Sequence, residues 1–364
     1  MNAKRVSTLV VTAAMSLGLA AGSLAQTPTV MATGLDNPRG LAFGPDGAVY
    51  VAEAGRGGTS SLCLPNPPGP PGSRCYGASG AITRITAPGV HGRILGGLPS
   101  VAGPTGAEAT GPHDIAFGFG RAFVTVGSGG DPALLTPFRA AGINLATLLM
   151  ISYTGQITPI ADFGAFEAAN NPAGGPIDTN AYGLEVLATR AVIADAGGNS
   201  LLQIDGSLTL STLAVFGTRT VPGPGGVGTV EMEAVPTAIA EGPDGSLYVG
   251  QLTGFPFPTG EARVYRVPAG GGTPAVVADG FTNIIDIALG PDGAAYVLEH
   301  DANSLLVAGN IGRLTKIGPF GQRTELAAGL LVAPGKVAIG ADNAVYVTVN
   351  STSAGSGEVW RITQ

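Results

Sequence analysis

The sequence has few charged residues and few of the residue types that usually carry out chemistry. Asp, Glu, Lys and Arg together make up 12% of the 364 residues, and the chain has three histidines, two cysteines and one tryptophan. Acidic residues outnumber basic ones by 25 to 18, which gives a formal net charge of −7. Because nucleic acid and anionic lipid bind basic surfaces, this composition argues against either partner.

The motifs of common enzyme classes are absent as well. The glycine-rich stretches at 127–130 and 223–228 lack the Lys-Ser/Thr of a phosphate-binding loop. The chain has no nucleophile elbow, no His-Glu-x-x-His and no haem-attachment motif. The sequence alone therefore indicates no particular reaction and leaves open whether the protein is an enzyme.

Long apolar runs are missing after the first 21 residues. Lys4 and Arg5 precede an apolar run at 6–21, and small residues at 23–25 fit a cleavage site before Gln26. This pattern predicts a secretory signal peptide over residues 1–25, and hence a secreted or periplasmic protein without a membrane span in its mature chain. A membrane anchor is the alternative, but the run is short and is interrupted by polar and small residues.

The two cysteines, Cys63 and Cys75, flank a proline-rich segment at 64–71. In an oxidising compartment they are expected to form a local disulfide. Free thiols are the alternative. Zinc binding is disfavoured, because two thiols with no nearby pair of histidines cannot fill a tetrahedral shell.

A repeated hairpin is the most informative feature that is present. Gly44-Pro45-Asp46-Gly47 separates two apolar strands, and the same four residues recur at 242–245 and 290–293, with Gly-Ala-Asp-Asn at 340–343. Proline presets a type I turn, and the last Gly or Asn accepts the positive φ that such a turn needs. Two weaker copies occur at 114–124 and 182–194. The chain therefore holds six copies of one unit.

The spacing of these copies predicts an all-β, six-bladed β-propeller. Equivalent residues of the second strand lie 73, 69, 56, 48 and 50 positions apart, measured at Tyr50, Phe123, Val192, Tyr248, Tyr296 and Tyr346. A four-stranded blade needs about 40 to 50 residues, so the earlier copies carry insertions. A β-sandwich or two smaller β domains would not explain the period. Residues 26–364 are thus expected to form one propeller domain.

Two further features of the propeller can be predicted from the sequence. The strand at Thr29 to Thr33 is expected to complete the last blade beside the strand at Glu358 to Ile362, which would close the ring. Helical insertions are expected at 132–141 and 161–169.

Polar residues gather where the first strand of each predicted blade starts and the second ends. The starts carry Arg39, His113, Asp114, Tyr182, Thr237, Asp286 and Lys336, and the ends carry Glu53, Asp195, Gln251, Glu299, His300 and Asn350. In a propeller these positions meet at one mouth of the central channel. They predict a ligand pocket lined by Arg39, His113, Tyr182, Asp286 and Lys336.

Several uses of this mouth remain open. Arg39, His113 and Lys336 suit an anionic ligand, whereas Glu53, Asp195 and Glu299 suit a hard cation such as Ca²⁺. Alternatively, the charged groups form ion pairs with one another across a water-filled channel, for example Arg39 with Asp286 or Lys336 with Glu53. If catalysis occurs, His113 is the best acid or base, with Asp114 or Asp286 orienting it.

The longer motifs resemble the ScyD/ScyE family, whose members are exported NHL-like six-bladed propellers, a fold also similar to TolB. The resemblance covers nearly all of residues 26–364 and is carried by NPRGLAF (37–43), GPHDIAF (111–117), NNPAGGPID (170–178), ADAGGNS (194–200), GQLTGFPFP (250–258) and FTNIID (281–286). It implies export and the propeller, but no reaction. Ala181 and Gly335-Lys336 depart from the expected Pro and Thr-Gly, so the channel mouth is expected to differ here.

Two functions follow as hypotheses. The first is an exported, monomeric binding or scaffold protein for a small molecule, glycan or partner protein at the channel mouth. The second, by analogy of fold alone, is a metal-dependent lactonase or hydrolase.

Overall fold

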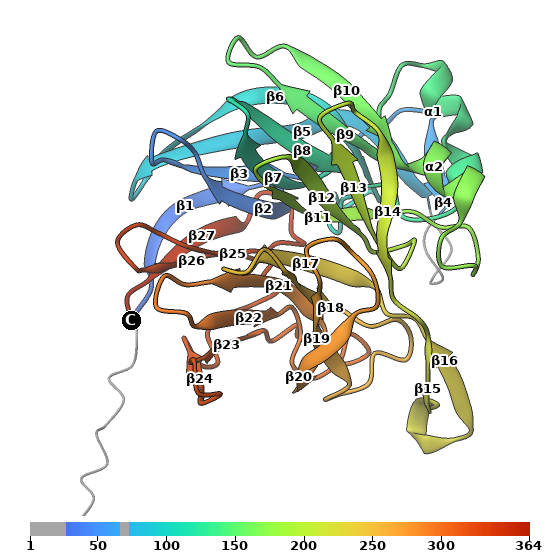
Figure 1. Ribbon diagram of the computed structural model, residues 1–364. Helices are drawn as coiled ribbons and strands as arrows, with labels where there is room; N and C mark the ends of the chain where they lie inside the picture. Colours follow the sequence, from blue (N-terminus) through green and yellow to red (C-terminus); the bar gives the residue numbers. More distant parts are fainter. Residues whose placement is uncertain (1–26, 66–72) are drawn as a thin grey trace, which may run out of the picture.

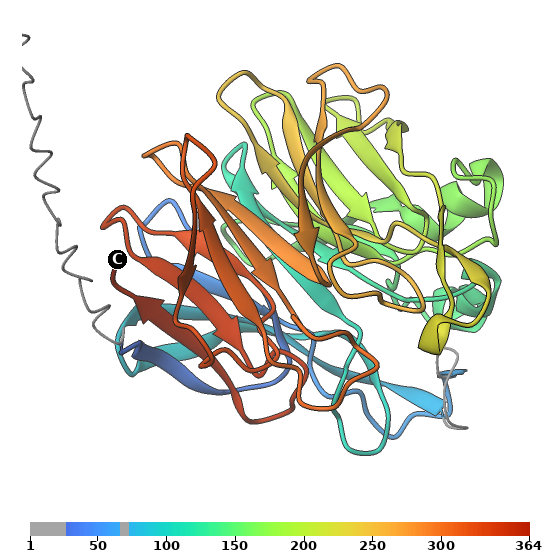
Figure 2. The ribbon, with the colours of Figure 1, turned by 90° about the horizontal axis from the view of Figure 1, so that it is seen from below.

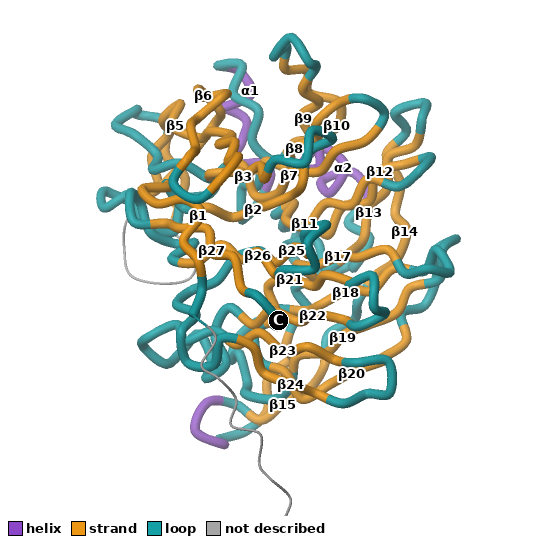
Figure 3. Tube along the Cα trace, turned by 90° about the vertical axis from the view of Figure 1, so that its left-hand side faces the viewer, coloured by secondary structure: helices purple, strands orange, loops and turns teal. Residues whose placement is uncertain are grey.

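A computed structural model describes residues 27–65 and 73–364 of the chain. The predicted signal peptide and most of the proline-rich segment lie outside the described residues. The rest forms six main β-sheets arranged radially around one axis (Figures 1 and 3), which confirms the six-bladed β-propeller. Each blade has four main strands, and its first strand lies next to the axis.

Blades 1 to 3 occupy the N-terminal half of the chain. Blade 1 consists of β2 (Pro38–Phe43), β3 (Val49–Glu53), β5 (Ser73–Ala87) and β6 (Val90–Ala102), with the short β4 (Cys63–Pro65) beside β5; blade 2 of β7 (Pro112–Gly118), β8 (Arg121–Val126), β9 (Thr147–Ile151) and β10 (Ile157–Asp162); and blade 3 of β11 (Ala181–Val186), β12 (Arg190–Asp195), β13 (Ser200–Asp205) and β14 (Leu210–Val215).

Blades 4 to 6 follow the repeat more closely. Blade 4 consists of β17 (Pro236–Glu241), β18 (Leu247–Gln251), β19 (Ala262–Val267) and β20 (Ala275–Phe281); blade 5 of β21 (Ile284–Leu289), β22 (Ala295–Glu299), β23 (Arg313–Ile317) and β24 (Arg323–Leu326); and blade 6 of β25 (Val337–Ile339), β26 (Val345–Val349), β27 (Gly357–Ile362) and β1 (Thr29–Leu35).

The ring is closed by the first strand of the chain, as predicted. β1 pairs antiparallel with β27, with Thr29 opposite Arg361 and Val30 opposite Trp360. Figure 1 shows the C-terminus beside the start of β1. Met31, Ala32 and Leu35 are buried in a core shared by blades 6 and 1. Burial of these apolar side chains therefore joins the two ends of the chain.

The Asp of the repeated turn and the Tyr that follows it belong to a small surface cluster of hydrogen bonds and ion pairs. Asp46 accepts a hydrogen bond from the backbone N–H of Ala48 at 3.2 Å, and its carboxylate also binds the hydroxyl of Tyr50 and the guanidinium of Arg84 on β5. The same Asp pairs with a cation on the third strand in blades 4, 5 and 6, as Asp244–Arg266, Asp292–Lys316 and Asp342–Arg361. The turn residue thus ties three strands together.

The inner strands of neighbouring blades approach one another so closely that two positions require glycine. A Cβ added to Gly40 would lie 2.6 Å from the Cα of Asp114, and one added to Gly183 would lie 2.3 Å from the carbonyl oxygen of Thr237. This approach brings side chains at the strand starts of different blades to the axis.

Insertions gather on the face where the inner strands start, here called the start face. They include the 3-10 helix η1 (Pro132–Leu135) with α1 (Thr136–Ala140), α2 (Phe163–Asn170), and the projecting hairpin of β15 (Arg219–Pro222) and β16 (Thr229–Met232), which encloses η2 (Pro224–Gly226). Figures 1 and 2 show the helices, β4 and this hairpin at one end of the molecule. The two expected helical insertions are confirmed. The opposite face, formed by the repeated turns, is called the turn face.

The expected disulfide is also confirmed. Cys63 on β4 and Cys75 on β5 lie directly opposite each other and are bonded. No helix in the described part of the chain is long and apolar enough to cross a membrane.

Candidate functional site

Three of the residues predicted from the strand starts form an ion cluster across the axis. The Nζ of Lys336 lies 2.6 Å from Oδ2 of Asp114 and 3.0 Å from Oδ1 of Asp286. Both carboxylates are almost completely buried. Because the three residues start blades 6, 2 and 5, the cluster acts as a strut that links opposite sides of the ring.

Backbone N–H groups of the same blade and of neighbouring blades complete this strut. Asp114 accepts hydrogen bonds at 2.9 Å from the N–H groups of Ile115 and Leu184, and Asp286 accepts one at 2.9 Å from Val337. Burial raises the pKa of Asp286 to about 6, although Lys336 opposes this shift. Burial would lower the pKa of Lys336, but the two carboxylates outweigh it and raise that pKa. The lysine therefore stays charged.

The two specific ion pairs suggested from the sequence are not formed. Lys336 binds Asp114 and Asp286 in place of Glu53, and Arg39 donates to the carbonyl oxygen of Ala109 at 3.3 Å in place of Asp286. The sequence could not distinguish these pairings, because they depend on which side chains reach across the axis.

Two buried histidines lie near the guanidinium of Arg39. Nδ1 of His113 lies 3.0 Å from the carbonyl oxygen of Ala181, and Nδ1 of His300 lies 2.7 Å from that of Pro334. Burial, with a further contribution from Arg39, lowers the pKa of His113 to about 3 and that of His300 to about 4. Since a carbonyl can only accept, each neutral ring carries its proton on Nδ1 and has a lone pair on Nε2.

Two buried polar atoms at this place, Nε of Arg39 and Oη of Tyr182, lack a hydrogen-bond partner of good geometry among the described residues, although the guanidinium of Arg39 lies close enough to interact with the Tyr182 hydroxyl. The Tyr182 ring lies 4.8 Å from that of His113, centroid to centroid. Burial raises the pKa of Tyr182, and the nearby Arg39 partly offsets that shift. We call Arg39, His113, Tyr182 and His300 the arginine centre.

The three carboxylates considered for a metal belong to separate blades and share one structural role. Each ends the second strand of its blade and accepts a backbone N–H from the segment that enters the inner strand: Glu53 from Asp36 at 2.7 Å, Asp195 from Asn180 at 2.7 Å, and Glu299 from Thr282 at 2.6 Å.

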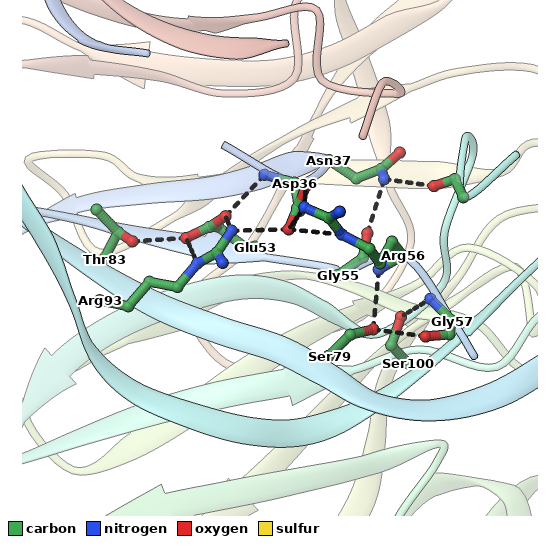
Figure 4. Close-up of polar contacts among 11 residues, drawn as sticks. Asp36, Asn37, Glu53, Gly55, Arg56, Gly57, Ser79, Thr83, Arg93 and Ser100 are labelled. Carbon is green, nitrogen blue, oxygen red and sulfur yellow. Dashed lines mark hydrogen bonds and ion pairs between the residues drawn. The ribbon is translucent and has the colours of Figure 1, made fainter. Parts of the chain in front are cut away.

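Glu53 is also held by a cation. Figure 4 shows Arg93 bound to both Glu53 and Asp36, at 2.7 Å from an oxygen of each, while Thr83 donates to Glu53. Arg56 binds the other side of Asp36. In the described part of the chain, no three His, Cys, Asp or Glu side chains are placed to hold a metal ion. The structure thus does not bring Glu53, Asp195 and Glu299 together as Ca²⁺ ligands.

A central cavity of about 330 Å³ lies on the other side of the strut, toward the turn face. The inner strands line it, with Lys336 at one end and Glu185 and Glu241 in its wall. Burial raises the pKa of Glu185 to about 7, and Lys336 opposes the shift. These two glutamates were not predicted from the sequence.

Glu185 should make the stability of the protein depend on pH. Its folded-state pKa lies above the ordinary value of 4.5, so its proton stabilises the folded state below about pH 4.5 and this contribution is lost as the pH rises to 7. Relative to Glu185→Gln, we expect the wild type to lose on the order of 2 kcal/mol over this range in urea unfolding. Glu108→Gln, at an exposed position outside the cavity lining, is the control. A difference between wild type and Glu185→Gln that is the same at every pH would contradict the assignment.

His300 is the member of the arginine centre that was not predicted from the sequence to be a ligand residue. Its position directly after Glu299, at the end of a second strand, was a usable signal. Asp36 and Arg93 were also missed, because Arg93 lies far along β6 and only the folded blade brings it to Glu53.

Comparisons with known proteins support the fold. No family model matches the sequence. No curated protein matches it either. The structure is similar to a "putative gluconolactonase" (TM-score 0.53, 11% identity, 94% of this chain and 93% of the other) and to an auxiliary nutrient binding protein from Bacteroides thetaiotaomicron (TM-score 0.53, 8% identity, 91% and 69%). It is also similar to a protein of unknown function from that organism (TM-score 0.54, 8% identity, 93% and 72%). At these identities the likeness concerns the fold alone.

Proposed function

We propose that this protein is a binding protein that holds a small hydroxylated carboxylate, such as a sugar acid, at the arginine centre. The observation that carries the proposal is the Arg39 guanidinium. It makes no ion pair with a described carboxylate, and its Nε is buried without a hydrogen-bond partner. A buried donor without a partner costs free energy, and an anion would supply the missing acceptor.

The neighbouring groups define the rest of the ligand. The neutral His113 and His300 each offer an acceptor at Nε2, which suits a ligand hydroxyl. Oη of Tyr182 can donate or accept. Lys336 and Asp286, which the sequence analysis counted among ligand residues, already bind each other and are assigned to the strut. The ligand thus combines one anionic group for Arg39 with hydroxyl groups for the histidines.

We expect D-glucuronate to bind and D-glucose, which lacks the carboxylate, to bind far more weakly in isothermal titration calorimetry. Arg39→Gln should weaken glucuronate binding at least about tenfold, because a charge-assisted hydrogen bond is lost. Arg121→Gln, on the turn face, is the matched control and should bind normally. Glucuronate affinity equal to that of glucose, or unchanged in Arg39→Gln, would refute the proposal.

We further propose that the protein is exported as one propeller domain and belongs to the ScyD/ScyE family. Residues 1–25 have the pattern of a signal peptide, the Cys63–Cys75 disulfide suits an oxidising compartment, and the motifs quoted above support the family. No specific observation favours the metal-dependent lactonase, since each carboxylate it would use accepts a backbone N–H from the segment that enters its blade, and no three His, Cys, Asp or Glu side chains among the described residues are placed to hold a metal ion.

A further inference from the structure

A second cavity, larger than the central one, lies away from the arginine centre, on the turn face. It is a groove of about 830 Å³ between blades 1 and 2, a size typical of small-molecule sites. Its floor consists of the buried Ile82, Ile115 and Ile151, which belong to the core shared by the two blades. The groove therefore continues this core toward solvent.

Apolar and aromatic side chains form the walls. Phe43, Tyr50 and Phe117 line the inner part, and the rings of Tyr50 and Phe117 contact each other edge to face at 4.8 Å. Ile94, which is 58% exposed, forms one rim on β6. A ligand with an apolar body would remove these surfaces from water, and this burial of apolar area would stabilise the complex.

The opposite rim is built by two turns of blade 2. Tyr153 is 82% exposed, yet its hydroxyl lies against Gly120, where an added Cβ would lie 2.9 Å from that oxygen. The turn that carries Tyr153 is held by a hydrogen bond from the N–H of Gln156 to the hydroxyl of Ser152 at 3.1 Å. The exposed tyrosine is thus part of an ordered wall.

The charges at the groove favour an anion. Asp46 lines it, but the guanidinium of Arg84 neutralises this carboxylate. Arg121 also lines it, and its guanidinium makes no ion pair or hydrogen bond to another residue in the described ranges 27–65 and 73–364. One positive charge is therefore left at the edge of an apolar surface.

We propose that this groove is a second binding site, which takes an amphiphilic carboxylate such as a medium-chain fatty acid. The hydrocarbon chain packs against Phe43, Phe117 and Ile94, and the carboxylate binds Arg121. The site is independent of the proposed function, because it shares no residue with the arginine centre.

Calorimetric titration with decanoate and with 1-decanol tests the proposal. We expect decanoate to bind with a stoichiometry of one, and Ile94→Asn to weaken both ligands about tenfold by removing apolar contact. Arg121→Gln should weaken decanoate about tenfold without changing 1-decanol, and Arg121→Lys should restore much of the loss. Phe320→Ala removes an aromatic that is 95% exposed on another turn of the same face and serves as the control.

Several results would overturn this inference. One is the absence of decanoate binding, and another is decanoate binding that neither Ile94→Asn nor Arg121→Gln changes. A third is concentration-dependent dimerisation in light scattering that Ile94→Asn abolishes, because a second copy of the chain would then occupy the groove. Arg39→Gln should bind decanoate normally and Ile94→Asn should bind glucuronate normally. The two proposals can therefore fail separately.

Discussion

Lys336→Met is expected to destabilise the protein by about 3–5 kcal/mol, because it leaves two buried carboxylates without their cation. Lys336 contacts both Asp114 and Asp286, which are 2% and 1% exposed. Neither can reach bulk water without disturbing the inner strands, so removal of the lysine leaves like charges facing each other across the axis. Urea unfolding at pH 7.5 measures the effect.

Two further variants separate loss of charge from loss of packing. Lys316→Met removes the cation of an ion pair at the surface, with Asp292, and should cost no more than about 1 kcal/mol. The triple variant Lys336→Met with Asp114→Asn and Asp286→Asn should recover much of the loss, since it removes the unpaired charges. Equal stability of Lys336→Met and Lys316→Met would mean that the strut does not hold the ring.

Deletion of residues 27–35 should have the second large effect. It removes β1, leaves the edge of β27 unpaired and exposes the core that Met31, Ala32 and Leu35 fill. Each large apolar side chain lost from a core costs about 2–5 kcal/mol, so we expect the truncated protein to lose its cooperative thermal transition or to aggregate.

Point variants of β1 give the same information if the truncated protein cannot be purified. Leu35→Ala should lower the free energy of unfolding by about 2–4 kcal/mol. Thr33→Ala, at an exposed position of the same strand, should change it little. An unchanged midpoint for Leu35→Ala would contradict closure of the ring through β1.

Much of this fold could be predicted because its determinants are local. The turn residues Pro45, Asp46 and Gly47 specify a hairpin by their own backbone preferences, and Gly47 adopts the expected positive φ of 74°. The strands predicted at Thr29 to Thr33 and at Glu358 to Ile362 lie within β1 and β27. Repetition then supplies the architecture, since equivalent units must stack.

The site was harder to predict, because its contacts join residues that are distant in sequence. Position at a strand start placed Lys336 and Asp114 at the axis, but 222 residues separate them and nothing local determines that they bind each other. The shared role of Glu53 and Glu299 could have been detected, since Asp36-Asn37 and Thr282-Asn283 stand at equivalent places before their inner strands.

The most direct test of the proposed binding site is a high-resolution crystal structure of residues 26–364 grown with saturating D-glucuronate. We expect electron density for the sugar acid at the arginine centre, with its carboxylate on Nε of Arg39 and a hydroxyl on Nε2 of His113 or His300. Density for water alone around Arg39 and Tyr182 under these conditions would contradict it.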